Sequence, residues 1–293
     1  MSGPARVGIP RAVDTTARTF GRSAIDQDPR PFREPLRCGG CPAPVGPVGG
    51  YPRRDGTAVS SHYRLRRGHE HDPGCLFHFD ARAGELVVEH RREIDRHGDH
   101  YVLVLRDPDL GRAVVTPELP PVDPRSRLQV VPRTGVPVLH PTISAAAAIA
   151  RLLRVFENDP EARNAFHATY DGCTYAWNDV YFDAAHDAVR LLRTVEQGTT
   201  RPLVVRGAVQ ETGRSRRGDT HYVRLSTGRG VQDARGRWIN LYLRATDSAE
   251  LDYQPGDDII GYGPWKSYAP PEGRSIQVTL WCDRHGATAR AHH

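Results

Sequence analysis

Cysteine and histidine, the side chains best suited to hold a metal ion, are concentrated in one N-terminal stretch. Cys38 and Cys41 form a C-x-x-C pair across two glycines, and Cys75 closes the stretch. Two thiolates at this spacing can bind one Zn²⁺, and the glycines permit the tight turn between them. His71 precedes Cys75 by four positions, a common interval for a second pair of ligands. We therefore predict a structural zinc site made of Cys38, Cys41, His71 and Cys75, with His62 as the reserve ligand.

A second interpretation of the C-x-x-C pair is a redox motif or a set of buried free thiols. Redox motifs of this type accompany a βαβ pattern, and none surrounds this pair. The other cysteines, Cys173 and Cys282, are isolated in the sequence. An odd number of widely spread cysteines, in a chain without an apolar leader, argues against a disulfide framework. Zinc therefore remains the favoured interpretation.

The order of these residues resembles the N-terminal zinc-binding segment of competence protein CoiA-like proteins and related mobile-element proteins. Their pattern is roughly CxxC, HFxH and GxEHxxxC; here His62-Tyr63 stands at the second step and Gly-His-Glu-His at 68–71 begins the third. Leu65 replaces the second histidine of HFxH. The resemblance implies a zinc-binding segment, and CoiA-like proteins also carry a nuclease-like domain. Lys266 is the only lysine and lacks that domain's acidic partner, so we do not carry the nuclease activity over.

The region 201–288 has a different signature, in which apolar residues alternate with aromatic, polar and basic ones. The run 238–244, Trp-Ile-Asn-Leu-Tyr-Leu-Arg, shows this period of two, which is typical of half-buried strands. Five such runs separated by turns predict a small OB-like β-barrel with an aromatic and basic outer face. The residues expected to contact nucleic acid are Tyr222, Arg224, Trp238, Tyr242, Arg244, Trp265, Lys266 and Trp281, together with the loop arginines Arg214, Arg216 and Arg217.

The alternative for this region is that its aromatics pack against other parts of the chain and its arginines only increase solubility. The net charge of +5 and the pI near 9.1 favour an acidic partner such as nucleic acid. No G-x-S-x-G, P-loop or H-E-x-x-H motif is present, so the sequence offers no catalytic nucleophile. We therefore expect binding rather than catalysis.

The rest of the chain suggests an α+β protein of several segments. We expect helices at 145–156 and 187–197, a hairpin turning on Asp171-Gly172, and a strand at 100–106. The stretch 85–90 is read as a strand, with a helix as the alternative. The predicted organisation is a disordered arm at 1–36, a zinc module with short strands at 37–110, a Pro-rich linker at 111–141, a helical segment at 142–200 and the OB-like barrel at 201–288.

These observations lead to a first hypothesis of a cytoplasmic protein that binds single-stranded nucleic acid, DNA rather than RNA, with structural Zn²⁺. The cytoplasmic location is expected because no signal peptide or apolar span is evident. Two other classes remain open. One is a CoiA-like metal-dependent nuclease, degenerate or cryptic, with acids from the region 89–109. The other is a protein-interaction subunit of a mobile-element system, with a protein partner in a DNA-processing complex.

Overall fold

The computed structural model describes residues 7–53, 56, 58–107, 141–215, 218–246, 251–270, 273–282 and 287–291. Within these residues the chain divides into two compact units. The first unit comprises residues up to Val104 together with Ala145–Asp179, and the second comprises Leu105–Ser144 and Val180 onward. The predicted Pro-rich linker at 111–141 lies outside the described residues except for its last position, which begins helix α2 (Pro141–Val155).

The first unit opens with an antiparallel sheet in the order β2-β1-β3-β4-β7. The prediction of a disordered arm over 1–36 is therefore wrong for the described residues from position 7 onward. Ile9, Phe20 and Phe32 are buried in the same core as Cys38, but they follow no regular period and so give no strand signal. The bounds are β1 (Arg11–Val13), β2 (Thr19–Gly21), η1 (Arg22–Ala24), β3 (Leu36–Cys38), β4 (Pro44–Val48), β5 (Tyr51–Pro52), β6 (Ala58–Val59) and β7 (His62–Leu65).

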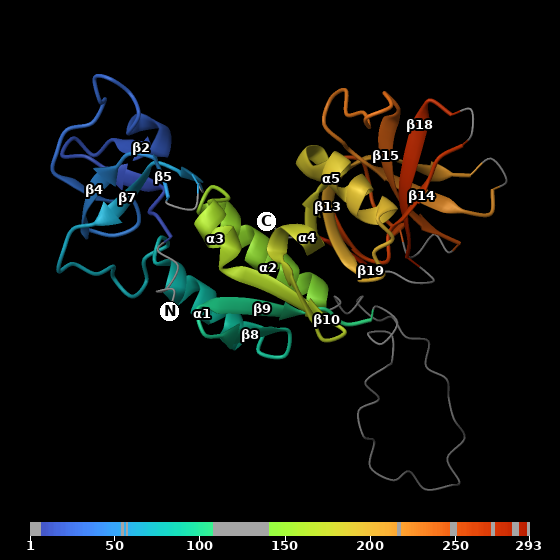
Figure 1. The fold of residues 1–293 in the computed structure, drawn as a ribbon, viewed down its shortest axis with the longest axis horizontal. Helices are drawn as coiled ribbons and strands as arrows, with labels where there is room; N and C mark the ends of the chain where they lie inside the picture. Colours follow the sequence, from blue (N-terminus) through green and yellow to red (C-terminus); the bar gives the residue numbers. More distant parts are fainter. Residues whose placement is uncertain are drawn as a thin grey trace, which may run out of the picture. The chain divides into compact units, whose positions relative to one another are not determined.

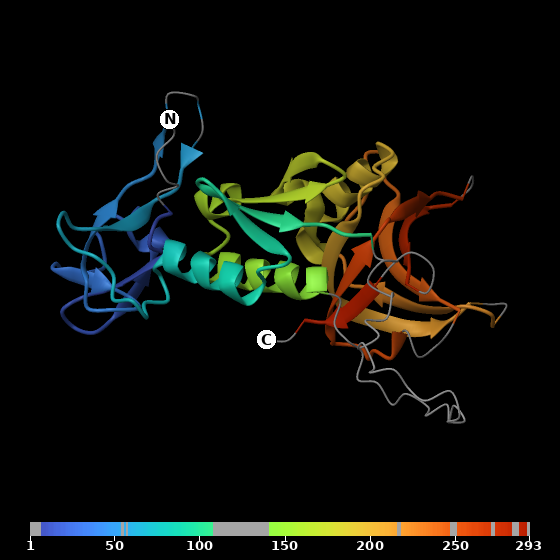
Figure 2. The same ribbon diagram turned by 90° about the horizontal axis from the view of Figure 1, so that it is seen from below.

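The first unit continues with a second sheet, in the order β11-β10-β9-β8, and helices α1 and α2 run along it (Figure 2). Strand β9 pairs in parallel with β10, so the predicted boundary between a zinc module and a helical segment is not a structural division. Phe79 of α1 packs against Tyr101, Phe156 and Phe166 in edge-to-face geometry, which ties the helix to the sheet. The bounds are α1 (Phe79–Glu89), β8 (Ile94–His97), β9 (His100–Val104), α3 (Pro160–Asn164), β10 (Phe166–Tyr170), β11 (Cys173–Ala176) and α4 (Trp177–Val180).

Several local predictions hold in this part of the chain, and one does not. The helix expected at 145–156 is α2, and the expected hairpin turns on Asp171 and Gly172, both with positive φ. The strand expected at 100–106 is β9. Residues 85–89 belong to α1 and His90 caps its end, so the interpretation as a strand is wrong and the helical alternative holds. Its Leu-Val-Val run fits either period, and the preceding helical turn from Phe79 decides the outcome.

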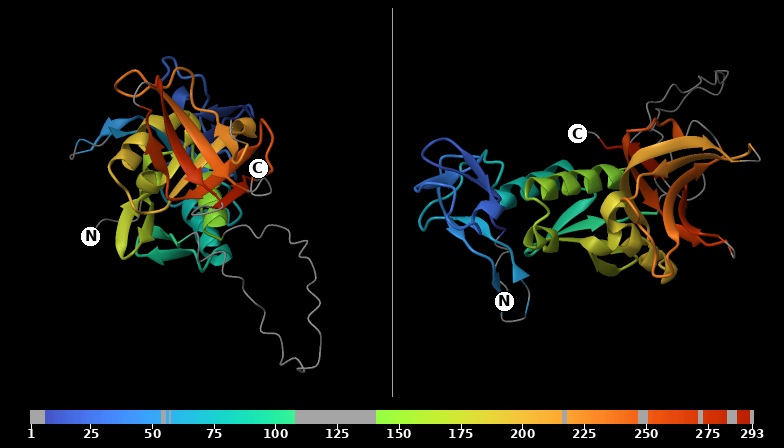
Figure 3. Two further views of the ribbon diagram at one scale, coloured as in Figure 1. Left: turned by 90° about the vertical axis from the view of Figure 1, so that its right-hand side faces the viewer. Right: turned by 90° about the horizontal axis from the view of Figure 1, so that it is seen from above.

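The second unit is built on a strongly curved sheet in the order β17-β18-β15-β14-β13-β16-β19, with β12 also pairing β13 (Figure 3). Strand β13 pairs with β16 through Leu203–Ala208 and with β14 through Val209–Arg214. A register shift between Val209 and Glu211 marks the change of partner, as expected where a strand bends. The bounds are β12 (Tyr181–Asp183), β13 (Leu203–Arg214), β14 (His221–Leu225), β15 (Trp238–Ala245), β16 (Asp258–Gly263), β17 (Lys266–Tyr268), β18 (Ser275–Trp281) and β19 (Ala287–Arg290).

Helix α5 (Ala184–Glu196) packs on this sheet beside β13 and β15 (Figure 1). The Asp183 side chain caps it by accepting the backbone N–H of Ala185. Leu191, Leu192 and Val195 form its buried stripe and join the core made by the inward residues of the strands. Among the described residues, we find no helix with the length and apolar character that a membrane crossing requires.

Candidate metal centre and candidate nucleic-acid face

The four residues predicted to bind metal, Cys38, Cys41, His71 and Cys75, meet in one cluster, the Cys/His centre. Their ligand atoms all lie within 4.8 Å of one another. The Sγ atoms of Cys38 and Cys75 are 3.7 Å apart, and Cys41 Sγ lies 3.4 Å from His71 Nδ1. A tetrahedral Zn²⁺ with bonds of about 2.0–2.3 Å requires ligand separations of this size. The donor set and its spacing therefore fit a zinc ion, and His71 would bind it through Nδ1.

Backbone N–H groups point at the sulfur atoms of the Cys/His centre. Gly40 donates to Cys38 Sγ and Phe77 donates to Cys75 Sγ, each at 3.4 Å. Burial acts to raise the pKa of Cys41, but hydrogen bonds from backbone groups of Asp72 and Ala43 outweigh it and lower that pKa. Such bonds favour thiolates over thiols. Backbone donors directed at several sulfur atoms fit a site for a cation better than they fit a disulfide.

Burial and mutual repulsion act on the other members of the centre in the absence of a cation. Burial raises the pKa of the Cys38 and Cys75 thiols. Burial, and then the neighbouring His78, lower the pKa of His71, so its imidazole is neutral and able to coordinate near pH 7. The ring of His78 stacks on that of His71 with centroids 5.4 Å apart. A bound cation would compensate the thiolates and release their protons.

Two strands and a long loop position the centre. Cys38 ends β3, where Ala12 of β1 pairs with it, and the turn to Cys41 follows at once. His71 and Cys75 lie in the loop between β7 and α1. The reserve ligand His62 is not part of the cluster, because it lies on β7 with its Nδ1 2.9 Å from the carbonyl oxygen of Ser60. The other four residues therefore form the centre without His62.

The second candidate site is the outer face, which we define as the outward side chains of β14, β15, β17 and β18. Pairing registers place Arg224 beside Tyr242, then Thr279, then Lys266 in one row. In β14, β15 and β18 the intervening residues, such as Val223 and Leu241, are buried. Neighbouring rows, by the same registers, are Tyr222-Arg244-Trp281, Asn240-Gln277-Tyr268 and Trp238-Ser275.

Contacts within the outer face hold its aromatic and basic groups in place. Arg224 donates to Asn240 Oδ1 at 2.7 Å, and Arg244 donates to Gln277 Oε1 at 3.0 Å. The Arg244 guanidinium also lies 5.3 Å from the centre of the Tyr242 ring. These amide contacts orient the guanidinium groups without neutralising them. The result is a set of positioned cations beside a ring.

Tyrosine packing adds to this order. The rings of Tyr222 and Tyr242 meet edge to face with centroids 5.7 Å apart. Burial raises the pKa of Tyr242. A side chain added at Gly213, which pairs with Tyr222, would come within 2.8 Å of the tyrosine hydroxyl. Glycine at this position therefore leaves room for the Tyr222 ring to lie across β13.

The structure corrects the predicted membership of this face. Trp265 is only 2% exposed and belongs to the core, because the chain between β16 and β17 turns its ring inward. Tyr268, which the predicted set omits, is 62% exposed and pairs with Gln277. Side chains alternate between the two sides of a strand, so Tyr268 is expected on the same side as Lys266, two residues earlier. Trp238 is exposed, Trp281 is half-buried, and Arg214 ends β13 on an exposed position, whereas Arg216 and Arg217 lie outside the described residues.

Comparison with known proteins gives little beyond these geometries. No protein-family model matches the chain, and no curated protein matches it. One similar solved structure is described as an aspartyl-tRNA synthetase from Leishmania major Friedlin, at 9% identity and a TM-score of 0.24. The match covers 42% of this chain and 22% of that one. At this score the likeness supports no conclusion, and the resemblance of the Cys/His segment to CoiA-like proteins stays a prediction.

Proposed function

We propose that this protein binds single-stranded nucleic acid on the outer face, and that the Cys/His centre holds a structural zinc ion. The observation that carries the proposal is the row structure of the outer face, in which aromatic rings and guanidinium groups alternate across paired strands. Base–aromatic stacking contributes about 1–3 kcal/mol per base and tolerates any sequence. The guanidinium groups supply phosphate contacts.

The strand pairing supports an OB-like barrel as the scaffold of this face. Strands β16 and β17 are separated by Pro264 and Trp265 alone, yet they pair with β13 and β18, which lie far apart in the strand order. This continuity connects β17, at one end of the sheet path, with β16, which is next to the last strand at the other end, and such a connection is expected in a five-stranded Greek-key barrel. In OB-folds the outer surface of the middle strands binds oligonucleotides. We propose that the outer face corresponds to that surface.

Charge on the outer face favours binding over metal-dependent cleavage. The outward residues of its four strands, as the structure describes them, include no carboxylate. Glu211 of the adjacent β13 lies 3.8 Å from Arg224. Lys266 stands opposite Thr279, without an acidic neighbour in the register. Cleavage by divalent metal ions needs carboxylate ligands at the scissile phosphate. We therefore propose a binding protein, and single-stranded DNA is the first ligand to test.

A titration of fluorescein-labelled oligothymidylate, followed by anisotropy at low salt, tests the proposal. We expect saturable binding that weakens steeply as salt is added, since phosphate contacts release counterions. Trp238→Ala should weaken binding about 5- to 150-fold, the equivalent of about 1–3 kcal/mol. Tyr51→Ala is the matched control, because Tyr51 and Trp238 are both 48% exposed but Tyr51 belongs to the first unit.

Two results would contradict the proposal. One is absence of binding at low salt by the zinc-loaded protein. The other is an equal loss of affinity in Tyr51→Ala and Trp238→Ala. Trp238 would then contribute no more to binding than an exposed aromatic residue of the first unit.

A further inference from the structure

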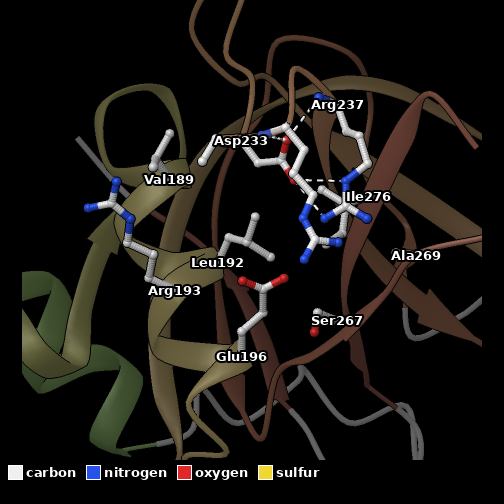
Figure 4. Close-up of a pocket in the computed structure, with 11 residues that line it drawn as sticks. Val189, Leu192, Arg193, Glu196, Asp233, Arg237, Ser267, Ala269 and Ile276 are labelled. Carbon is white, nitrogen blue, oxygen red and sulfur yellow. Dashed lines mark hydrogen bonds and ion pairs between the residues drawn. The ribbon is translucent and has the colours of Figure 1, made fainter.

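A pocket of about 330 Å³ lies between α5, the loop 231–237 and strands β17 and β18 (Figure 4). Its apolar floor includes Leu192 and Ile276, both buried, and Ala269. This volume lies at the lower end of the range for small-ligand sites, and an apolar floor with a few polar groups is their usual composition. A single flat ring system is a ligand of suitable size.

Glu196 supplies the first polar group. Its carboxylate points into the pocket, whereas the side chain of Arg193, one turn earlier on the same helix, extends away from it (Figure 4). Glu196 is the last residue of α5, where the negative end of the helix dipole disfavours a carboxylate. No hydrogen bond or ion pair of this side chain is found within the described parts of the chain. Its two oxygens are therefore available to donors on a ligand.

Arg237 supplies the second polar group, held in a fixed position. Asp233 accepts from Arg237 Nε at 2.8 Å and lies 2.6 Å from its Nη2. Asp233 Oδ1 also accepts the backbone N–H groups of Arg235 and Arg237. These contacts use the acceptors of Asp233 and leave Arg237 Nη1 as an oriented donor. The pocket therefore presents a free carboxylate and a positioned guanidinium above an apolar floor.

We propose that this pocket receives one guanine base of the bound strand, an inference that rests on the proposed function. Guanine carries two adjacent donors, N1–H and the N2 amino group, which match the two oxygens of Glu196. Its O6 acceptor is next to N1 and matches Arg237, since guanidinium groups commonly bind O6 of guanine. Adenine and cytosine place an acceptor beside their amino group, and uracil and thymine carry a single donor. Guanine is the base whose pattern fits both groups.

Residues of the pocket and of the outer face are neighbours in the sequence. Trp238 follows Arg237 in the chain, and Tyr268 lies between the pocket residues Ser267 and Ala269. Both aromatic side chains are exposed. Because side chains alternate along a strand, Ser267 points to the side of β17 opposite Tyr268. Strand β17 is the last strand at its end of the sheet path, so a base that turns around this edge, away from the stacked bases, would reach the pocket. Recognition of a single splayed base on its Watson–Crick edge, with neighbours stacked on aromatics, is a common arrangement in single-strand binding.

The test compares oligothymidylates that carry one central dG or one central dA, by anisotropy, with the full chain loaded with zinc. We expect the dG oligonucleotide to bind about tenfold more tightly, since one bidentate base contact discriminates by about 1–3 kcal/mol. Glu196→Gln should abolish this preference. Glu89→Gln is the matched control, because Glu89 is the last residue of α1 and is exposed. It should retain the preference.

Equal affinity for the dG and dA oligonucleotides would overturn the pocket assignment, as would a dG preference that survives Glu196→Gln. In either case binding of oligothymidylate would leave the proposed function standing. Failure to bind any oligonucleotide would refute the proposed function, and titration with guanosine monophosphate would then test the pocket alone. No perturbation of pocket resonances by that nucleotide would overturn the assignment as well.

Discussion

The Cys/His centre and the outer face are both sites of chemistry, but the sequence encodes them in different ways. The centre draws on four residues in two short motifs, buried or half-buried, and each has one ligand atom to place. The outer face draws on four strands between positions 221 and 281, and its side chains stay partly exposed. A metal site depends on donor type and spacing, whereas a binding face depends on which side of a strand each residue occupies. The first is therefore local information and the second is not.

Removal of the metal should give the largest effect and should act on one region only. Structural zinc contributes about 10–16 kcal/mol in small zinc-finger peptides, which exceeds the stability of many domains. After chelation at neutral pH, we expect amide exchange protection to disappear from β3, β4 and β7 and to persist in β13, β15 and β18. Cys75→Ser should have the same effect. Cys173→Ser is the control, because Cys173 is exposed and lies outside the cluster.

Protection of β3 and β4 that survives complete metal removal would contradict this expectation. It would show that the apolar core around Phe20 and Leu36 suffices to hold the sheet.

Substitution of two tryptophans should distinguish a core residue from an outer-face residue of the second unit by its effect on stability. Trp265→Ala removes a buried ring and should lower the free energy of unfolding by about 3–5 kcal/mol. Trp238→Ala should change it by no more than about 0.5 kcal/mol, since that ring is exposed. Urea unfolding of the zinc-loaded variants measures both. Similar decreases in the free energy of unfolding for the two variants would mean that Trp238 also supports the fold. Trp238 could then no longer be assigned to the outer face as a binding residue alone.

Removal of the central ring should weaken binding without unfolding the protein. Tyr242→Ala removes the partner of both Tyr222 and Arg244, and we expect about a 5- to 150-fold loss of affinity for single-stranded DNA. Tyr242→Phe keeps the ring and should stay close to wild type. Anisotropy titrations of the three proteins decide this. A loss as large for phenylalanine as for alanine would assign the effect to the hydroxyl and not to stacking.

The arginines of the outer face should appear in the salt dependence of binding. Arg244→Gln should reduce the slope of log affinity against log salt by about one, because one phosphate contact is lost. Arg290 lies on β19 at an exposed position 3.3 Å from Asp257, and Arg290→Gln should leave the slope unchanged. An unchanged slope for Arg244→Gln would indicate that this guanidinium faces a base or no ligand at all.

The smallest effect should be a difference in acid sensitivity between the two units. Burial, and then the neighbouring His100, lower the pKa of His167 in the first unit. The unfolded chain therefore binds more protons as the pH falls through about 6.5, and stability decreases below that pH. His167→Gln should reduce this decrease, measured as unfolding midpoints at about pH 7.5 and 5.5. His186→Gln, on the exposed side of α5, should not. An unaltered pH dependence in His167→Gln would exclude this histidine as the cause.

The sequence predicted the two sites to different depths for physical reasons. Cys38, Cys41, His71 and Cys75 were identified as a set because metal-ligand spacing is short-range. Period-two alternation placed Tyr242 and Arg244 on one side of β15, and the neighbouring registers agree. Alternation ends at turns, so Trp265 was assigned to the wrong side and Tyr268 was missed.

The N-terminal strands show a further limit. Phe20 and Phe32 are spaced irregularly in a stretch rich in glycine and proline, and such a composition is typical of a flexible arm. Their burial depends on pairing between β1 and β3, which is a contact between segments far apart in the chain. A local pattern carries no information about such a partner. The parallel pairing of β9 with β10, across residues 105–165, was missed for the same reason.

Photocrosslinking of the zinc-loaded protein to single-stranded DNA carrying 5-iodouracil tests the central claim most directly. Mass spectrometry of the adducts should locate them at the aromatic residues of the outer face, foremost Trp238, Tyr242 and Tyr268. A tenfold excess of unlabelled oligothymidylate should suppress these adducts. Adducts confined to the first unit, or to residues such as Tyr253 away from the outer face, would contradict the account.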